Sequence, residues 1–202
     1  VEPQQDTFDW RLYDPVVEDA LAHGLRIYAT IAYTPAWATA GPEWTGVPLR
    51  TADWEDVCYR AAQRYAGRID AWGMWNEPNV SRFWSGSRAD YIYKILKPGS
   101  AAVHAADPDA KVCGPELAHL QSADWDGWLD EVIRRADGAL DVVTHHLYPD
   151  GSDSRSVARA LIADRNRPWE PPSVRQVLEA AGWLGRPFWL TETGYNAASG
   201  TI

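Results

Sequence analysis

Two glutamates stand where apolar, aromatic-rich runs of the sequence give way to loops. Glu77 follows Trp72-Gly73-Met74-Trp75-Asn76, and Glu192 follows Phe188-Trp189-Leu190-Thr191. At the rim of a buried core a carboxyl group keeps its proton unless a partner stabilises the charged form. Two carboxyl groups in unequal surroundings can divide the roles of acid and nucleophile, as glycoside hydrolysis requires. The alternative is that each glutamate only caps a loop or pairs with an arginine.

The elements that must position these glutamates alternate along the chain. Short β-forming runs alternate with longer amphipathic runs, and Gly or Pro marks each change. Strands are expected at residues 25–33, 69–75, 111–114, 141–146 and 187–191. Helices are expected at residues 14–23, 52–66, 88–106, 124–136, 156–164 and 173–181, with capping boxes at Ser87/Asp90 and Ser173/Gln176.

This order predicts an α/β fold with parallel strands, since the sequence contains no hairpin motif and a helix separates successive strands. An open doubly wound sheet and a closed (β/α)8 barrel both satisfy the order. No GxGxxG or GxxxxGK[ST] motif follows any strand, which removes the main support for a nucleotide-binding open sheet. The polar clusters instead follow the strands, where barrel enzymes carry their functional groups. We therefore expect a (β/α)8 barrel.

Two motifs resemble those of clan A glycoside hydrolases, which are retaining enzymes on a (β/α)8 barrel. They are Trp75-Asn76-Glu77-Pro78 and Thr191-Glu192-Thr193-Gly194-Tyr195, and the fuller stretches 75–84 and 105–112 are most similar to bacterial family 39 and family 5 type sequences. The resemblance implies that Glu77 is the acid/base at the end of strand 4 and Glu192 the nucleophile at the end of strand 7. It also implies that Asn76 hydrogen-bonds the sugar 2-hydroxyl. Strict strand alternation would point Asn76 away from Glu77, so this role requires the strand to end or bulge there.

Further candidates for substrate binding follow from the same resemblance. His146-Leu147-Tyr148 resembles the clan's His-x-Tyr, in which the tyrosine hydroxyl orients the nucleophile and the histidine lines the site. A histidine at a strand end is otherwise commonly a satisfied core residue. Thr34-Pro35-Ala36-Trp37 resembles the clan's Pro-x-Trp loop, which makes Trp37 a candidate sugar platform. The remaining aromatic candidates, each as able to pack a loop as to bind substrate, are Phe83, Trp84 and Tyr195.

No metal and no cofactor are expected. Neighbouring strand residues point to opposite sides, so His145 should face the helices and cannot easily share one metal ion with His146. Cys58 and Cys113 lie in no metal-binding spacing and are expected to be buried free thiols.

Composition excludes several partners. A formal net charge of −9 with only three lysines argues against nucleic acid. No apolar run reaches the ~18 to 20 residues of a membrane span. The 12 tryptophans suit a protein core and also a site that stacks flat sugar rings, so a carbohydrate substrate is expected. Residues 1–6 lack the regions of a signal peptide, and the sequence leaves open a secreted or a cytoplasmic location and the oligomeric state.

The chain of 202 residues is short for this fold. The expected strands begin about every 40 residues, so eight units would need about 320, within the ~200 to 400 of such barrels. The resemblance assigns the five strands as barrel strands 3 to 7, with strands 1, 2 and 8 missing, so residues 1–202 are expected to be a partial catalytic domain. Open edges should make the isolated chain poorly soluble or unable to hold its glutamates in register. The alternatives to an enzyme are a catalytically incompetent fragment and a non-catalytic carbohydrate-binding pseudoenzyme.

Overall fold

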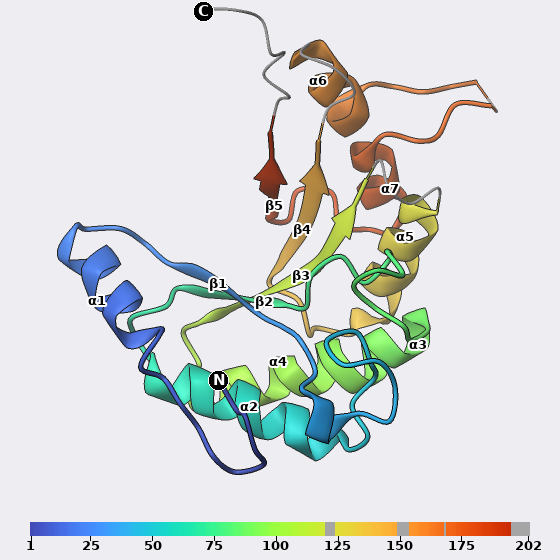
Figure 1. Ribbon diagram of the computed structural model, residues 1–202. Coiled ribbons are helices and arrows are strands. Elements are labelled where there is room, and N and C mark those ends of the chain that lie inside the picture. The colour runs from blue at the N-terminus through green and yellow to red at the C-terminus, as the bar shows by residue number, and fades with distance from the viewer. Residues whose placement is uncertain (120–123, 149–153, 168, 195–202) are drawn as a thin grey trace, which may run out of the picture.

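A curved sheet of five parallel strands forms the centre of the molecule. The computed structural model describes residues 1–119, 124–148, 154–167 and 169–194. The strands pair in sequence order, each with the next (Figure 1): β1 Tyr28–Ile31, β2 Ala71–Met74, β3 Lys111–Ala118, β4 Val142–Leu147 and β5 Phe188–Thr193. This arrangement confirms the expected parallel α/β fold and supplies, within the described residues, five of the eight strands of a (β/α)8 barrel.

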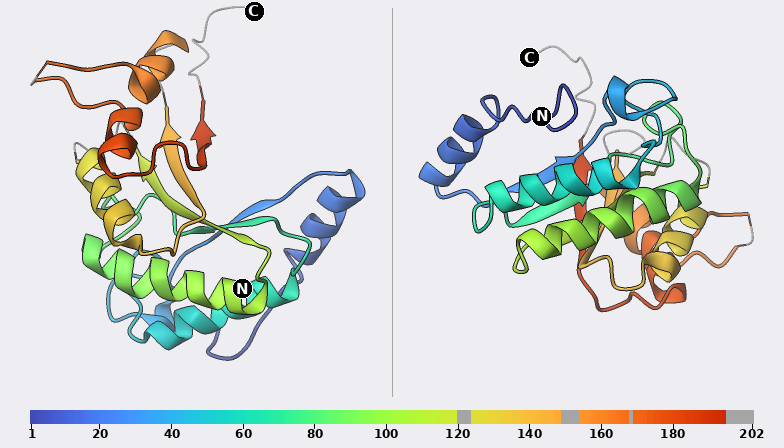
Figure 2. Two further views of the ribbon diagram at one scale, coloured as in Figure 1. Left: turned by 180° about the vertical axis from the view of Figure 1, so that it is seen from behind. Right: turned by 90° about the horizontal axis from the view of Figure 1, so that it is seen from below.

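Helices cover the convex side of the sheet. α2 and α4 lie side by side under the first three strands, while α5 and α7 flank the strands that follow (Figures 1 and 2). α1 lies beyond β1 at the edge of the molecule (Figure 1), and its Asp14 forms an ion pair with Arg64 at the end of α2. The helices are α1 Asp14–Ala22, α2 Thr51–Arg64, α3 Arg88–Asp90, α4 Lys97–Ala106, α5 Trp125–Ala136, α6 Ser154–Ile162 and α7 Val174–Ala180, with a short 3-10 helix η1 Ala36–Ala38. In the part of the chain that the structure describes, no helix has the length and apolar character needed to cross a bilayer.

Two predictions about these elements are wrong in detail. The third strand was expected to end at Gly114, but β3 runs to Ala118. Proline is tolerated in a strand at a bulge, and a register shift between Pro115 and Leu117 lets β3 continue past it. The helix expected at 88–106 is not uniform, because a π-helical segment, η2 Tyr91–Leu96, joins α3 to α4. Pro98 has no N–H to bond to the preceding turn, and a widened turn is a usual way to accommodate that loss.

The capping boxes form as predicted. The Ser87 hydroxyl accepts a hydrogen bond from the Asp90 N–H, and the Asp90 side chain accepts one from the Ser87 N–H. Ser173 and Gln176 do the same at the start of α7. These reciprocal bonds satisfy backbone donors that a helix start leaves unpaired, so each box fixes where a crossover helix begins.

The main core lies between the sheet and its helices. Packing in the core was one of the two roles expected for the tryptophans. Seven of them are buried in this core or at its margin: Trp54, Trp72, Trp75, Trp84, Trp125, Trp128 and Trp183. Both cysteines are buried free thiols, as predicted. α4 approaches β2 so closely that a Cβ on Gly99 would lie 2.7 Å from the Met74 sulfur. A larger residue at position 99 would push α4 away from the strand that leads to Glu77.

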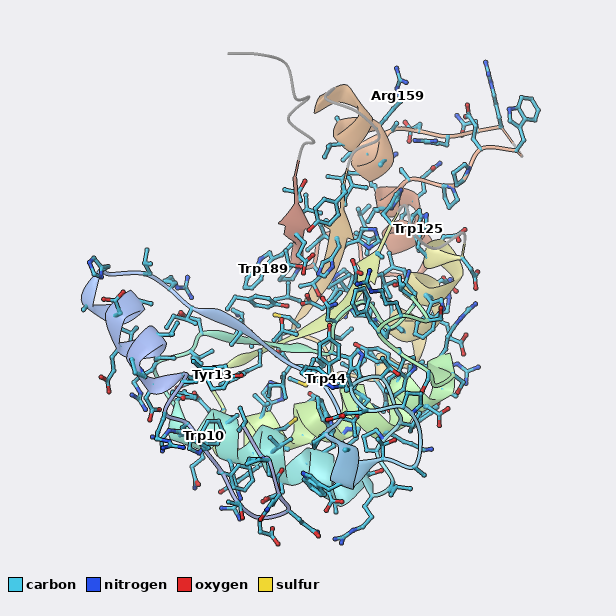
Figure 3. All side chains as sticks on the ribbon, viewed as in Figure 1. Trp10, Tyr13, Trp44, Trp125, Arg159 and Trp189 are labelled. Atoms are coloured by element: carbon cyan, nitrogen blue, oxygen red, sulfur yellow. The ribbon has the colours of Figure 1, made fainter. Side chains whose placement is uncertain are left out.

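The concave side of the sheet carries smaller and more polar residues. Ala71, Cys113 and Val142 form a small cluster there with Tyr28. Trp189 projects from β5 toward β1, and its ring meets that of Tyr28 at 6.4 Å between centroids (Figure 3). Side chains of the first and last described strands therefore meet across the arc, beneath the level at which the strands end.

Candidate active site

Glu77 leaves the sheet through an irregular backbone turn. β2 ends at Met74, after which Trp75 has a φ of +76° and Glu77 a φ of +44°. Such values are uncommon for residues other than glycine. They end the strict alternation that would have placed Asn76 and Glu77 on opposite sides. The turn is fixed by the N–H of Trp75, which donates to the carbonyl of Ile31, and by the N–H of Glu77, which donates to that of Glu116.

The residues around this turn hold it in place. The Trp75 ring is fully buried and its Nε1 donates to the carbonyl of Phe83. Asn79 makes two hydrogen bonds with the backbone of Ala118, one as donor at 2.8 Å and one as acceptor at 3.0 Å. The loop that carries Glu77 is thereby tied to the end of β3.

Glu192 lies on β5 beside His146. The register of β4 against β5 shifts between His145 and His146, which pairs His146 with Glu192. The Tyr148 hydroxyl donates a hydrogen bond of 3.0 Å to Glu192 Oε2. The Glu192 side chain is 43% exposed, whereas that of Glu77 is 8% exposed. The two glutamates thus stand in the unequal surroundings that a division between acid and nucleophile requires.

His146 lies between carboxylates. Its ring is fully buried, with Nδ1 at 3.0 Å from Glu77 Oε1 and Nε2 at 2.9 Å from Glu116 Oε2. Glu192 Oε2 is 3.4 Å from the same Nδ1. Burial lowers the pKa of His146, but its hydrogen bonds to Glu116 and Glu77 outweigh that effect and raise the pKa to about 9. At neutral pH the hydrogen bonds of the ring to Glu77 and to Glu116 therefore each contain a proton.

The two glutamates and His146 form one compact group. One carboxylate oxygen of Glu77, one of Glu192 and a ring nitrogen of His146 all lie within 4.8 Å of one another. This spacing would also suit a metal ion. Nδ1 of His146, the nitrogen that such an ion would need, is hydrogen-bonded to Glu77 Oε1 at 3.0 Å instead.

Glu116 is a residue of this group that sequence reasoning missed. It lies in the bulge of β3 with a φ of +58° and is 2% exposed. The expected strand stopped before Pro115, so Glu116 was assigned to no element. One feature of the sequence could have identified it: Glu116 closely follows an expected strand, as Glu77 and Glu192 do.

Tyr33 was also missed. Asn76 Nδ2 donates to the Tyr33 hydroxyl at 3.1 Å, and the Tyr33 ring packs against Trp75 and stacks on Phe83. Burial raises the pKa of Tyr33, and the nearby charges of Glu77 and Glu192 add to the increase. Tyr33 therefore lies close enough to both glutamates for their charges to affect its pKa.

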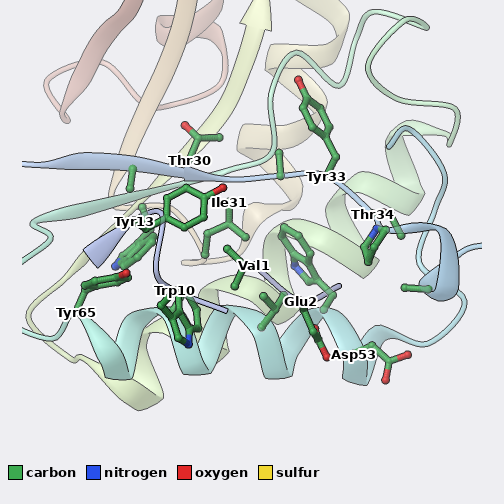
Figure 4. Close-up of a pocket in the computed structure, with 18 of the residues that line it drawn as sticks. Val1, Glu2, Trp10, Tyr13, Thr30, Ile31, Tyr33, Thr34, Asp53 and Tyr65 are labelled. Atoms are coloured by element: carbon green, nitrogen blue, oxygen red, sulfur yellow. The ribbon is translucent and has the colours of Figure 1, made fainter. Parts of the chain in front are cut away.

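The other aromatic candidates lie in different surroundings. Trp37 lies on η1, donates its Nε1 hydrogen to the carbonyl of Glu2 and lines a cavity of about 570 Å³ beside α2 (Figure 4). Glu77 and Glu192 do not line this cavity, whereas Tyr33 and Trp44 do. Trp84 is 2% exposed and packs on Trp75, so its ring stabilises the loop that carries Glu77. Tyr195 lies outside the described residues.

Trp44 is an aromatic residue near the site that the sequence did not single out. Its side chain is 63% exposed, and its ring centroid is 6.4 Å from that of Tyr33 (Figure 3). A backbone bridge to Thr34 fixes its position. An exposed indole next to residues that contact Asn76 has the character of a sugar-stacking surface.

His145 faces the helices, as strand alternation predicts. Its ring packs against Trp125 of α5, and its Nε2 is 3.0 Å from Nδ1 of His119. Burial lowers the pKa of His145 well below its ordinary value and, with a smaller effect of Arg165, lowers the pKa of His119 to about 4. These two rings are neutral at pH 7, unlike His146.

The opposite shifts predict a stability maximum near neutral pH. Between about pH 6.5 and 4 the unfolded chain takes up protons on His119 and His145 that the folded chain does not. The free energy of unfolding therefore decreases as the pH falls through this range. Between about pH 6.5 and 9 the folded chain keeps a proton on His146 that the unfolded chain has lost, so stability falls as pH rises. Each histidine contributes a slope of at most about 1.4 kcal/mol per pH unit.

Urea unfolding from pH 4 to 9 measures both slopes. His119→Gln should flatten the acidic slope and leave the basic slope unchanged. His23→Gln, at an exposed position after α1, is the matched control and should change neither slope. An acidic slope that is unchanged in His119→Gln would contradict the assignment.

Comparison with known proteins places the chain in a family. Residues 47–199 match the model of the family described as Glycosyl hydrolases family 39. A β-xylosidase of Geobacillus stearothermophilus is 23% identical over 96% of this chain and 42% of its own length. The chain therefore spans about two fifths of the curated relatives that it matches.

Solved structures share the fold. A family 39 β-xylosidase from Caulobacter crescentus has a TM-score of 0.71 and 23% identity, covering 96% of this chain and 43% of the other. A glucosidase from Croceicoccus marinus has a TM-score of 0.74 and 19% identity, covering 100% of this chain and 42% of the other. At this identity the likeness concerns the fold alone, whereas the family match covers most of the sequence. The chain belongs to glycosyl hydrolase family 39.

Proposed function

We propose that residues 1–202 form part of the catalytic domain of a retaining glycoside hydrolase, which cleaves β-linked O-glycosidic bonds of oligo- or polysaccharides by double displacement. The observation that carries this proposal is the spacing of Glu77 and Glu192, whose nearest carboxylate oxygens lie within 4.8 Å of each other. Retaining enzymes hold their carboxyl groups about 5 to 5.5 Å apart, whereas inverting enzymes leave about 6.5 to 9.5 Å for a water molecule. Because the curated relatives are named β-xylosidases, β-xylosides are the first substrates to test.

In the first step Glu192 acts as the nucleophile. One of its carboxylate oxygens attacks the anomeric carbon, while the bond from that carbon to the leaving oxygen breaks. Glu77 donates its proton to the leaving oxygen, so the aglycone departs as a neutral alcohol and the sugar remains as an ester of Glu192. Glu77 is buried beside His146, whereas Glu192 is more exposed, so the two carboxyl groups stand in the unequal surroundings that this division of roles requires.

In the second step Glu77 acts as the base. It takes a proton from a water molecule whose oxygen attacks the anomeric carbon, and the ester bond to Glu192 breaks. The sugar leaves with its original anomeric configuration, and both glutamates return to their starting states. The cycle uses no metal and no cofactor.

The neighbouring residues have supporting roles in this proposal. Tyr148 orients Glu192 through the hydrogen bond of its hydroxyl group. Asn76 binds the sugar 2-hydroxyl, and Tyr33, which accepts a hydrogen bond from its side-chain amide, holds it in place. His146 lines the site between the two glutamates.

Replacement of the glutamates separates their roles. In the complete catalytic domain, Glu192→Gln should lower kcat on aryl β-xylosides at least about 1,000-fold, since no nucleophile remains. Glu77→Ala should retain activity on substrates with good leaving groups and should be partly rescued by azide, which replaces the attacking water. Azide rescue of Glu192→Gln and not of Glu77→Ala would show that the roles are reversed.

Covalent labelling distinguishes an enzyme from the alternatives. A 2-deoxy-2-fluoro xyloside with a good leaving group should add one sugar to the peptide that contains Glu192, as detected by mass spectrometry. Absence of both turnover and label would favour a carbohydrate-binding pseudoenzyme or a catalytically incompetent fragment. Retained binding of xylo-oligosaccharides would then identify the first of these.

The stacking platform is tested separately. Trp37 is the candidate from sequence, while Trp44 is the more exposed indole and lies next to Tyr33. We expect Trp44→Ala to raise KM about 10-fold, which corresponds to the loss of about one aromatic contact. Trp37→Ala is the comparison, and a larger rise in KM for Trp37→Ala than for Trp44→Ala would restore Trp37 as the platform.

A further inference from the structure

Glu116 is a buried carboxylate to which the proposed mechanism gives no role. It is linked to Glu77 directly through its backbone and indirectly through the ring of His146. Its backbone carbonyl accepts a hydrogen bond of 3.0 Å from the Glu77 N–H, and its side chain reaches Glu77 through the ring of His146. The first contact requires no particular side chain at position 116. The second requires a group that accepts a hydrogen bond from Nε2 of His146.

The surroundings of Glu116 make its charge dependent on His146. Glu116 Oε1 is buried and has no hydrogen-bond partner among the described residues. Gly73 makes room for it, because a Cβ there would lie 2.9 Å from Glu116 Oε1 and 2.4 Å from the Tyr28 hydroxyl. Among the described residues, His146 is the only cationic side chain that forms an ion pair with Glu116. A carboxylate in such a place is costly unless a cation lies against it.

The charged groups around His146 come from every neighbouring strand. Glu77 follows β2, Glu116 lies on β3, and Glu192 lies on β5. His145, the adjacent residue on β4, is neutral at pH 7. The Tyr148 hydroxyl donates to Glu192, which raises the pKa of Tyr148, so this group contributes no charge at neutral pH. Glu116 is therefore the carboxylate that faces Nε2, while the two proposed catalytic glutamates face Nδ1.

We infer that Glu116 is a positioning residue that acts through His146 to hold the exchangeable proton of the proposed acid at Glu77. The inference rests on the proposed function for its catalytic meaning. With Nε2–H bound to Glu116, the other nitrogen, Nδ1, is the atom that faces Glu77. One proton then occupies the hydrogen bond between Nδ1 and Glu77 Oε1.

The proton count is the same in either form of this pair. An imidazolium beside a carboxylate and a neutral imidazole beside a protonated Glu77 differ only in the position of that proton. Glu77 gives the proton to the leaving oxygen in the first step and recovers one from water in the second. Glu116 takes part in neither step, and its carboxylate against Nε2 of His146 favours retention of the proton on the pair.

Replacement of Glu116 by glutamine tests the inference in the full chain. The amide keeps the size of the side chain and can still accept from Nε2–H, but the negative charge is lost. The midpoint of His146, followed by 15N NMR of labelled histidine and assigned from the signal missing in His146→Asn, should fall by at least about one pH unit. The basic limb of the pH profile of kcat/KM should shift down in parallel, with kcat lowered about 10-fold or more and KM little changed.

Controls separate positioning from folding. Glu18→Gln removes the same charge from the exposed face of α1 and should move neither the His146 midpoint nor the basic limb. A variant at Glu116 that loses stability but keeps both midpoints within about 0.2 pH unit would show a merely structural role and overturn the inference. If Glu116→Gln does not fold, the parent protein decides, because a neutral His146 ring beside an ionised Glu77 at pH 7 would also overturn the inference.

Failure of the proposed function gives a different result. If the parent protein cleaves no glycoside, the kinetic arm vanishes, but the NMR midpoints of His146 in the parent and in Glu116→Gln still test the coupling. A midpoint lowered in Glu116→Gln with no turnover by any variant would refute the enzyme and support the coupling. An unchanged midpoint in an active enzyme would refute the coupling alone.

Discussion

The placement of one buried imidazole among carboxylates is the constraint on which the site depends. Glu77, Glu116 and Glu192 come from three different strand ends, and Glu77 and Glu116 are buried, where like charges repel one another more strongly than in water. His146 lies between them, with hydrogen bonds of 3.0 Å to Glu77 and 2.9 Å to Glu116. Because the ring uses both nitrogens, its orientation is fixed, and every carboxylate that contacts it is fixed in turn. The sheet order places β4 between β3 and β5 and so brings His146 to this position.

Irregular backbone at the strand ends turns regular strands into a site. Trp75, Glu77 and Glu116 all have positive φ values, and register shifts occur in β3 beside Pro115 and in β5 before Glu192. Such conformations cost free energy and persist only where the surrounding contacts fix them. Here the buried Trp75 ring and the two bonds of Asn79 supply those contacts. Bulges of this kind often lie next to active sites because they redirect a side chain without disturbing the rest of the strand.

The sequence predicted the fold better than the details of the site. Periodicity and Gly or Pro boundaries were enough for the order of elements, and the capping boxes marked two helix starts correctly. Glu77, Glu192, His146 and Tyr148 were identified through motifs, and the structure brings these four together. Glu116 and Tyr33 were not identified. Pro115 led us to expect that the third strand ends at Gly114, before Glu116. The contact of Tyr33 with Asn76 joins residues 43 positions apart, and no local pattern predicts it. Trp37 stays a prediction, since the cavity that it lines is shared with Tyr33 and Trp44 but not with Glu77 or Glu192. Contacts between distant strand ends depend on register, which short-range patterns do not determine.

The central claim is that Glu77 and Glu192 act as a close pair, one as acid and one as nucleophile. The stereochemistry of the first product tests it most directly, because it depends on the separation of the two carboxyl groups and on no assumption about which sugar binds best. Proton NMR of the anomeric region, recorded in the first minutes of hydrolysis of an aryl β-xyloside, distinguishes the two anomers before they equilibrate. A retaining pair should release the β-anomer first, and the α-anomer should appear only later, through mutarotation. First appearance of the α-anomer would contradict it.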